Sequence, residues 1–172
     1  FDPPLINQST YYRRKATAGA TTVFSNVVFF DVKSTQGDQV TYGQGFWNAY
    51  FYEGENNFDS SNYVGYLTFP DIFNESFCGT NCDIITNGCL LNSEYFSVRL
   101  KMEYTLPLGD YQITIGGDDG VRLSVDGGQT YIMNDYYLHS CRTTIDTLTL
   151  GDKVTFVFDY YDEGTQSSKG IA

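Results

Sequence analysis

The sequence holds few of the residues on which most catalytic and transition-metal sites are built. It has a single His, His139, together with one Trp, four Cys and two Met among 172 residues. No nucleophile partner for His139 is evident, and no widely spaced pair of carboxylates in distinct environments, as glycoside hydrolysis requires, can be picked out. We therefore expect that the chain is not an enzyme.

Cations are also scarce, since 10 Lys and Arg stand against 21 Asp and Glu and give a formal net charge of −11 with a pI near 4.2. A field of this sign repels phosphate backbones and anionic lipid surfaces, which argues against nucleic-acid and membrane partners. No apolar run is long enough to span a membrane, and no signal peptide is visible. The simplest interpretation is the solvated acidic surface of a secreted, extracellular protein, and such a surface suits neutral ligands and hard cations.

The four cysteines are Cys78, Cys82, Cys89 and Cys141. An even number in a chain of extracellular character predicts two disulfides. Zinc is the alternative, but the first pair has the spacing C-x3-C and only one His is available, whereas zinc sites show tighter pairs. Among three possible connectivities we expect a local bond between Cys78 and Cys82 and a second between Cys89 and Cys141, which makes residues 74–92 a long disulfide-tied loop.

No long stretch has apolar residues at helical spacing, whereas strand-forming aromatic residues are abundant, with 15 Tyr, 13 Phe and 17 Gly for turns. Within residues 121–125 and 154–161, apolar side chains occupy every second position, the pattern of a half-buried antiparallel strand. The prediction is an all-β fold, an antiparallel β-sandwich with little helix. The expected strands are residues 10–16, 23–32, 47–53, 63–69, 95–104, 111–115, 121–125, 130–133, 144–150 and 154–161.

The most informative segment is residues 108–127, LGDYQITIGGDDGVRLSVDG. Asp118 and Asp119 lie side by side between glycines at the expected end of a strand, and two adjacent like charges are costly unless a cation is present. Calcium binds six to eight oxygens, including carboxylates and backbone carbonyls, and the flanking glycines permit the backbone geometries that such a site needs. The alternative is a plain turn in which Asp119 only accepts hydrogen bonds from backbone N–H groups.

Three segments together resemble a known family. They are WNAYFYEG at residues 47–54, FSVRLKMEYTLPLGDYQITIGGDDGVRLSVDG at residues 96–127, and TLTLGDKVTFVFDYYDEG at residues 147–164. In this order they are similar to the anthrax protective-antigen-type (PA-fourteen) β-sandwich, a jelly-roll-like domain shared with yeast flocculin lectins. The resemblance places that domain at residues 41–172.

Within residues 1–40, the segment STYYRRKATAGATTVFSNVV at residues 9–28 resembles the last hairpin of immunoglobulin-like repeats in long surface proteins of gliding bacteria. This resemblance implies that residues 1–40 are the tail of an upstream repeat, and the alternative is that these strands belong to the main sandwich. The abrupt start at Phe1 and end at Ala172 lead us to expect a segment of a longer chain.

The resemblance to the lectin branch also implies a site. In that branch an Asp-Asp pair joined by a cis peptide binds one calcium ion, which also binds two hydroxyls of a sugar, and the pair falls on Asp118 and Asp119. A second loop follows the last long strand, here DEGTQSS at residues 162–168, although the family's lectin-type asparagine is missing from it. The implied metal ligands are Asp118, Asp119, Glu163, Thr165 and Gln166, and the implied sugar-binding residues are Asp118, Asp119, Gln166, Ser167 and Tyr136.

The function implied is that of a calcium-dependent lectin, a monomeric carbohydrate-binding module within a large secreted or cell-surface adhesin. Such a module recognises vicinal diols of sugars. Two alternatives stay open: a non-binding spacer or protein-contact domain in a surface array, and an accessory domain of a secreted glycosidase.

Overall fold

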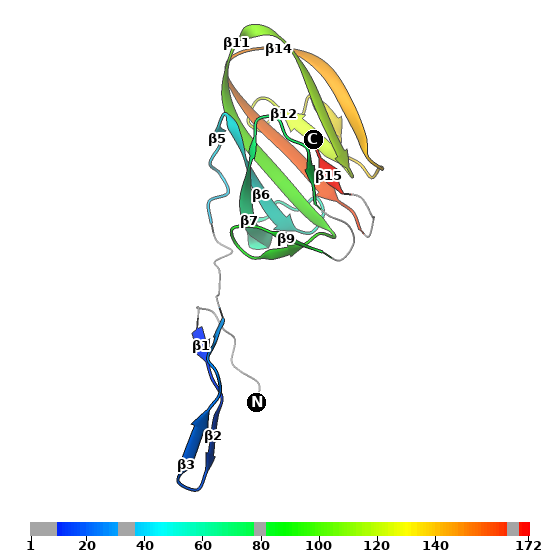
Figure 1. The fold of residues 1–172 in the computed structure, drawn as a ribbon. Helices are drawn as coiled ribbons and strands as arrows, with labels where there is room; N and C mark the ends of the chain where they lie inside the picture. Colours follow the sequence, from blue (N-terminus) through cyan, green and yellow to red (C-terminus); the bar gives the residue numbers. More distant parts are fainter. Residues whose placement is uncertain (1–9, 31–36, 78–81, 165–168) are drawn as a thin grey trace. The chain divides into compact units, whose positions relative to one another are not determined.

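The structure, a computed structural model, describes residues 10–30, 37–77, 82–164 and 169–172. These residues form β-strands and turns with a single 3-10 turn, η1 (Ser60–Asn62), and no α-helix among them, which confirms the predicted all-β class (Figure 1). In the described part of the chain no helix has the length and apolar character needed to cross a membrane. The chain divides into two compact units, Phe1–Ser34 and Thr35–Ala172.

The first unit consists of two antiparallel strand pairs, where two longer strands were predicted. Strand β1 (Thr10–Tyr12) pairs with β4 (Val28–Phe30), and β2 (Lys15–Ala18) pairs with β3 (Thr21–Phe24). The turn between β2 and β3 contains Gly19 at φ +60, a conformation that glycine adopts readily. Among residues 10–29 all side chains except those of Thr10 and Tyr12 are exposed, so this part of the unit has no core of its own.

The second unit contains a nine-stranded sheet and a separate hairpin of β9 and β10. All pairings are antiparallel except that of the two-residue β5 with β11. The strands are β5 (Gly43–Gln44), β6 (Phe46–Glu53), β7 (Tyr63–Pro70), β8 (Glu75–Ser76), β9 (Asp83–Ile85), β10 (Leu90–Asn92), β11 (Phe96–Asp118), β12 (Val121–Ser124), β13 (Met133–Asp135), β14 (Arg142–Asp162) and β15 (Gly170–Ile171).

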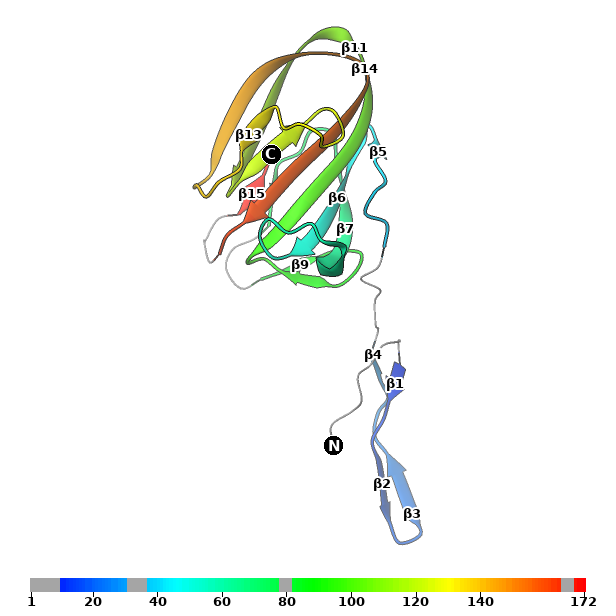
Figure 2. The ribbon, with the colours of Figure 1, turned by 180° about the vertical axis from the view of Figure 1, so that it is seen from behind.

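Two long strands, β11 and β14, fold this sheet over into a sandwich-like arrangement (Figures 1 and 2). They pair with each other along almost their whole length, with a register shift between Leu106 and Gly109. The first half of β11 pairs with β6, and the second half of β14 pairs with β12. Beyond the bend, the end of β11 pairs with β15, which pairs with β8. The four shorter strands predicted at 95–104, 111–115, 144–150 and 154–161 are therefore parts of these two.

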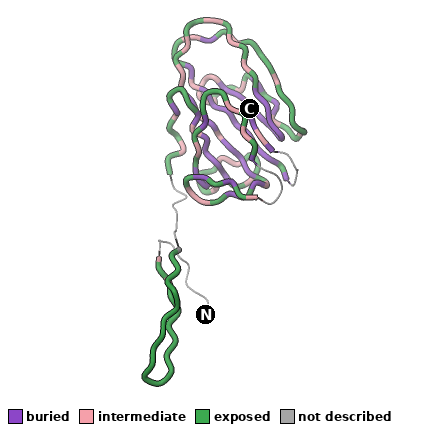
Figure 3. The backbone as a smooth tube through the Cα atoms, in the orientation of Figure 1, coloured by how far each residue is buried: buried purple, intermediate pink, exposed green. Residues whose placement is uncertain are grey.

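The main core lies between the two halves of the folded sheet (Figure 3). Trp47, expected in the core, is 6% exposed there, and its ring contacts Phe156 and Phe158 at centroid distances of 6.1 and 6.2 Å. The opposite face of β14 was expected to be solvated, but Val157 and Asp159 on that face are buried as well. The segment before β6 and the segment between β6 and β7 contact this outer face. A second cluster of aromatic side chains, Tyr50, Tyr52, Tyr63 and Phe58, forms there.

The cysteines correct part of the disulfide prediction. Cys89 and Cys141 are free thiols, so the predicted bond between them is wrong. The backbone N–H of Cys89 donates to Val64 of β7 and its side chain packs against the core, whereas Cys141 is exposed just before β14. Cys82 is disulfide-bonded, and Cys78 lies outside the described residues. Residues 74–92 were expected to be one loop, but they also contain β8, β9 and β10.

Candidate metal centre

Asp118 and Asp119 lie where β11 ends and turns into β12. The peptide bond between them is cis, as in the family that the sequence resembles. Both residues are buried, at 4% and 0% exposure. Asp118 is held by its backbone, since it pairs with Gly170 of β15 and its carbonyl oxygen accepts a 2.6 Å hydrogen bond from the Tyr160 hydroxyl. Two carboxylates are thus fixed next to each other in the protein interior.

Gly120 completes this turn because no side chain fits at its position. A Cβ there would lie 2.2 Å from Cε1 of Tyr161 and 3.0 Å from the backbone nitrogen of Tyr137. The carbonyl of Gly120 accepts a 3.1 Å hydrogen bond from the backbone N–H of Tyr161. The glycine after the two aspartates therefore allows the turn to lie directly against β14.

The two oxygens of Asp119 have different surroundings. Oδ2 accepts a 2.7 Å hydrogen bond from the backbone N–H of Glu163. Oδ1 is buried and accepts no hydrogen bond of normal geometry from the described residues. Burial raises the pKa of this carboxyl, and the charge of Asp118 raises it further. The backbone N–H of Glu163 opposes this rise, and so does that of His139, although the latter forms no hydrogen bond of normal geometry with Asp119. A buried oxygen without a partner is costly, so this atom calls for a proton or a cation.

The second predicted loop begins beside this pair. Glu163 approaches Asp119 through its backbone N–H, while its side chain is exposed. An amide donor cannot ligate a cation, so this contact fixes the loop and leaves the ligand role of the Glu163 side chain a prediction. Thr165, Gln166 and Ser167, the other residues predicted from this loop, lie outside the described residues.

A buried ion pair, not found from the sequence, closes the base of this loop. Lys169 Nζ lies 3.0 Å from Oδ2 of Asp162, with side-chain exposures of 0% and 1%. The ammonium also donates to the carbonyl of Ser93, and Oδ2 of Asp162 accepts from the backbone N–H of Tyr95 at 3.3 Å. The pair therefore holds Asp162 and Lys169 against the segment before β11. A single Lys directly after an acidic loop was the available signal in the sequence.

Tyr136 was predicted to contact a sugar, and its ring packs within the protein. It lies edge-on to Tyr161 at a centroid distance of 4.8 Å and under the Arg122 guanidinium at 4.1 Å. Its hydroxyl is buried without a hydrogen-bond partner in the described part of the chain. The neighbouring Tyr137 is 52% exposed and is the more accessible ring.

His139, the only histidine, has structural partners. Its Nδ1 lies 2.8 Å from the carbonyl of Ser140, and its Nε2 lies 3.5 Å from a carboxylate oxygen of Asp135. The guanidinium of Arg142 also donates hydrogen bonds to Asp135 and forms an ion pair with it. These contacts place His139 in the segment after β13, where it helps to order the chain before β14.

The donor set at Asp118 and Asp119 fits a hard cation that binds oxygen. Within the described residues no group of three or more His, Cys, Asp or Glu side chains is arranged to hold a metal ion. A site here would therefore combine the two carboxylates with other oxygens, and calcium accepts backbone carbonyls, hydroxyls and water in such roles. The buried Oδ1 of Asp119 is the atom that a cation would satisfy.

Comparison of the chain with known protein families and with curated proteins finds no match. Membership of the protective-antigen-type family accordingly stays a prediction from the sequence. The functional argument rests on the residues of the site.

Proposed function

We propose that the chain is a calcium-dependent carbohydrate-binding module of the protective-antigen, jelly-roll-like type, a monomeric lectin domain of a large secreted or cell-surface adhesin. The observation that carries the proposal is the buried Oδ1 of Asp119, which has no hydrogen-bond partner among the described residues and lies next to a second buried aspartate. The resemblance in sequence supplies the ligand class, and the acidic surface agrees with an extracellular location.

A calcium ion would offset the electrostatic cost of the two carboxylates. The Glu163 amide fixes one oxygen of Asp119, which leaves the other for a cation. Asp118 supplies a second carboxylate, and residues 163–168 are the proposed source of further oxygens, including Glu163, Thr165 and Gln166. Calcium tolerates six to eight ligands of varied geometry, so such a mixed set is sufficient.

Sugar binding follows from the coordination positions that the protein leaves to water. Two neighbouring hydroxyls of a sugar replace two waters with little geometric cost, which favours vicinal diols. Gln166 and Ser167 are the proposed contacts that choose among sugars, since the ring of Tyr136 packs between Tyr161 and Arg122 and its hydroxyl is buried. A single site of this kind binds weakly, and many copies on one surface raise the effective concentration to give useful adhesion. In this proposal residues 1–40 are the tail of a preceding immunoglobulin-like repeat in such an array, and a local disulfide between Cys78 and Cys82 ties the loop before β9.

The decisive test measures calcium and sugar binding in the same protein. We expect calcium to raise the melting temperature and Asp119→Asn to abolish that rise, while Asp146→Asn, an equal charge change at an exposed site, retains it. A glycan array should show diol sugars bound in calcium and released in EGTA, a calcium chelator. Equal melting temperatures of the wild type in EGTA and in millimolar calcium would exclude the site.

One observation favours a second candidate, the non-binding spacer or protein-contact domain. The hydrogen bond from the Glu163 amide to Asp119 is the contact expected if the Asp-Asp-Gly turn is purely structural. In that case neither calcium nor any sugar changes the protein, and the melting temperature separates the candidates. If sugar binding is found, the sequence adjoining this module will distinguish an adhesin from a secreted glycosidase with an accessory domain.

A further inference from the structure

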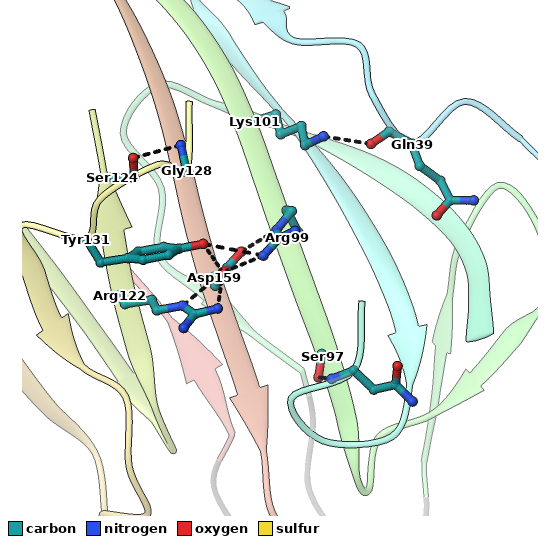
Figure 4. A network of polar contacts seen from close by, with 10 residues as sticks. Gln39, Ser97, Arg99, Lys101, Arg122, Ser124, Gly128, Tyr131 and Asp159 are labelled. Atoms are coloured by element: carbon teal, nitrogen blue, oxygen red, sulfur yellow. Dashed lines mark hydrogen bonds and ion pairs between the residues drawn. The ribbon is translucent and has the colours of Figure 1, made fainter. Parts of the chain in front are cut away.

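Two arginines share one buried aspartate on the outer face of the sheet, away from the main core (Figure 4). Arg99 comes from β11, Arg122 from β12 and Asp159 from β14, which lies between these strands in the sheet. Asp159 is 0% exposed, whereas the side chains of Arg99 and Arg122 are 26% and 25% exposed. The carboxylate is therefore enclosed, and each arginine side chain remains partly exposed.

The Asp159 carboxylate accepts five hydrogen bonds, and the arginines keep unused donors. Arg99 donates to both oxygens of Asp159 at 2.7 and 2.8 Å, and Arg122 donates twice to Oδ2 at 3.0 and 2.9 Å. The hydroxyl of Tyr131 adds a 2.6 Å bond to the same oxygen. A guanidinium has five N–H donors. The Nη1 groups of both arginines make no hydrogen bond with the described residues, so these groups are free to bind an acceptor from outside.

Aromatic rings hold both guanidiniums in place. The Arg122 guanidinium carbon lies 4.0 Å from the ring centre of Tyr131 and 4.1 Å from that of Tyr136. The Arg99 guanidinium carbon lies 4.0 Å from the ring centre of Phe58. Because stacking fixes the planes of these groups, little conformational entropy is lost when their edges bind a ligand.

Three cations, Arg99, Arg122 and Lys101, gather on this face although the whole chain carries −11. Lys101 lies on the same face of β11, two residues from Arg99, and its ammonium donates to the carbonyl of Gln39 at 2.9 Å. Burial and the charge of Arg99 lower the pKa of Lys101, while the charges of Asp159 and Asp38 oppose this shift. The next carboxylates, Asp38 and Glu103, have other partners, since Asp38 accepts from Tyr50 and Glu103 pairs with Lys153. Three cations thus face two carboxylates, Asp159 and Asp38, of which only Asp159 is ion-paired with the arginines.

We propose that the exposed edges of Arg99 and Arg122 form a binding site for a carboxylate, carried by an acidic sugar with one carboxylate per ring. The planar edge of a guanidinium matches the two oxygens of a carboxylate, and the adjoining rings of Tyr131 and Phe58 offer apolar surface to the sugar. The strongly negative charge of the whole protein disfavours dense polyanions such as nucleic acids, whereas a sparse carboxylate is attracted by the local positive charge. The site needs no calcium and is independent of the one at Asp118 and Asp119.

The test uses the full chain in EGTA, so that neither outcome depends on the calcium site. Digalacturonic acid is titrated against its dimethyl ester, a neutral molecule of nearly the same shape. The arginine Nε–Hε signals are followed by NMR and affinities are measured by calorimetry. We expect the signals of Arg99 and Arg122 to shift with the acid and not with the ester, while those of Arg142 stay in place.

Variants localise the effect. Arg122→Gln should weaken binding of the acid about tenfold, the loss expected for a hydrogen bond between charged groups. Lys153→Gln, an equal charge change at an exposed residue, and Asp119→Asn should both retain the wild-type affinity. Should Arg122→Gln fail to fold, the wild-type titration still decides. Equal responses to acid and ester, or unchanged arginine signals, would overturn the proposal.

Discussion

Lys169 and Asp162 carry the largest single polar contribution that we expect to stability. Their ion pair is buried at 0% and 1% exposure, and replacing one partner leaves the other charge without compensation. Lys169→Met should therefore lower the free energy of unfolding by about 3–5 kcal/mol. Urea unfolding in EGTA measures this loss without any contribution from bound calcium.

A matched control comes from Lys153, whose side chain is 63% exposed in its ion pair with Glu103. Lys153→Met should cost at most about 1 kcal/mol, because solvent screens that pair. The double variant Lys169→Met with Asp162→Asn should recover part of the loss, since it removes both charges together. Equal stability of Lys169→Met and Lys153→Met would contradict a dominant buried pair.

The residues that the sequence could identify are those whose signal is local. Asp118, Asp119 and Gly120 follow one another, so the turn could be located from spacing alone. For Lys169 the only signal was its place after an acidic loop, and its contact with Ser93, 76 positions away, leaves no local signal. The same applies to Arg99 and Arg122, which meet at Asp159 from separations of 60 and 37 positions. Partners of this kind are set by the register of the sheet, which a single sequence does not display.

At the scale of elements, the strands were found where apolar residues alternate, and their ends were missed where a bulge intervenes. Residues 105–110, TLPLGD, which contain Pro107, fall between the predicted strands 95–104 and 111–115. In the structure the ladder shifts register between Leu106 and Gly109 and then continues. Proline is tolerated at a bulge because its missing N–H is not needed there, so one bent strand replaces two.

The outer face of the sheet allows a prediction about alkaline pH. Burial raises the pKa of Tyr52, Tyr63 and Tyr131 to about 12 each, above the ordinary value of 10.0. The unfolded chain ionises these groups at lower pH than the folded protein does. Their contribution to stability is therefore complete below pH 10 and is lost as the pH rises toward 12.

Absorbance at 295 nm should show these tyrosines ionising in a late step together with the loss of β structure in circular dichroism. The variant Tyr52→Phe with Tyr63→Phe should reduce the amplitude of the late step. The alternation pattern predicts that the outer face of β14 is solvated, whereas it is buried in the structure. A single ionisation step near the ordinary tyrosine pKa would support the solvated face.

At the scale of the molecule, the all-β class and a sandwich followed from composition and alternation, while the order of the strands in the folded sheet did not. That order depends on the bend in β11 and β14 and on the closing pair of β15 with β8. Both short strands are two residues long, too short to leave a periodic signal. The arrangement of the strands therefore depends on pairing between segments far apart in the chain, and not on the local strand propensity of each segment.

The two units should be separable. Both clusters of buried apolar residues consist of residues from the second unit, and the described side chains of residues 10–29 are exposed except for Thr10 and Tyr12. A two-stranded ribbon is at best marginally stable alone, whereas the second unit has a complete core.

We expect residues 35–172 to melt within about 2 °C of the full chain, the shift that corresponds to less than 1 kcal/mol, and to retain the same calcium response. A peptide of residues 1–34 should give a random-coil circular dichroism spectrum. A fall of 10 °C or so in the melting temperature of residues 35–172 would instead show that the strand pairs contribute to the stability of the sandwich.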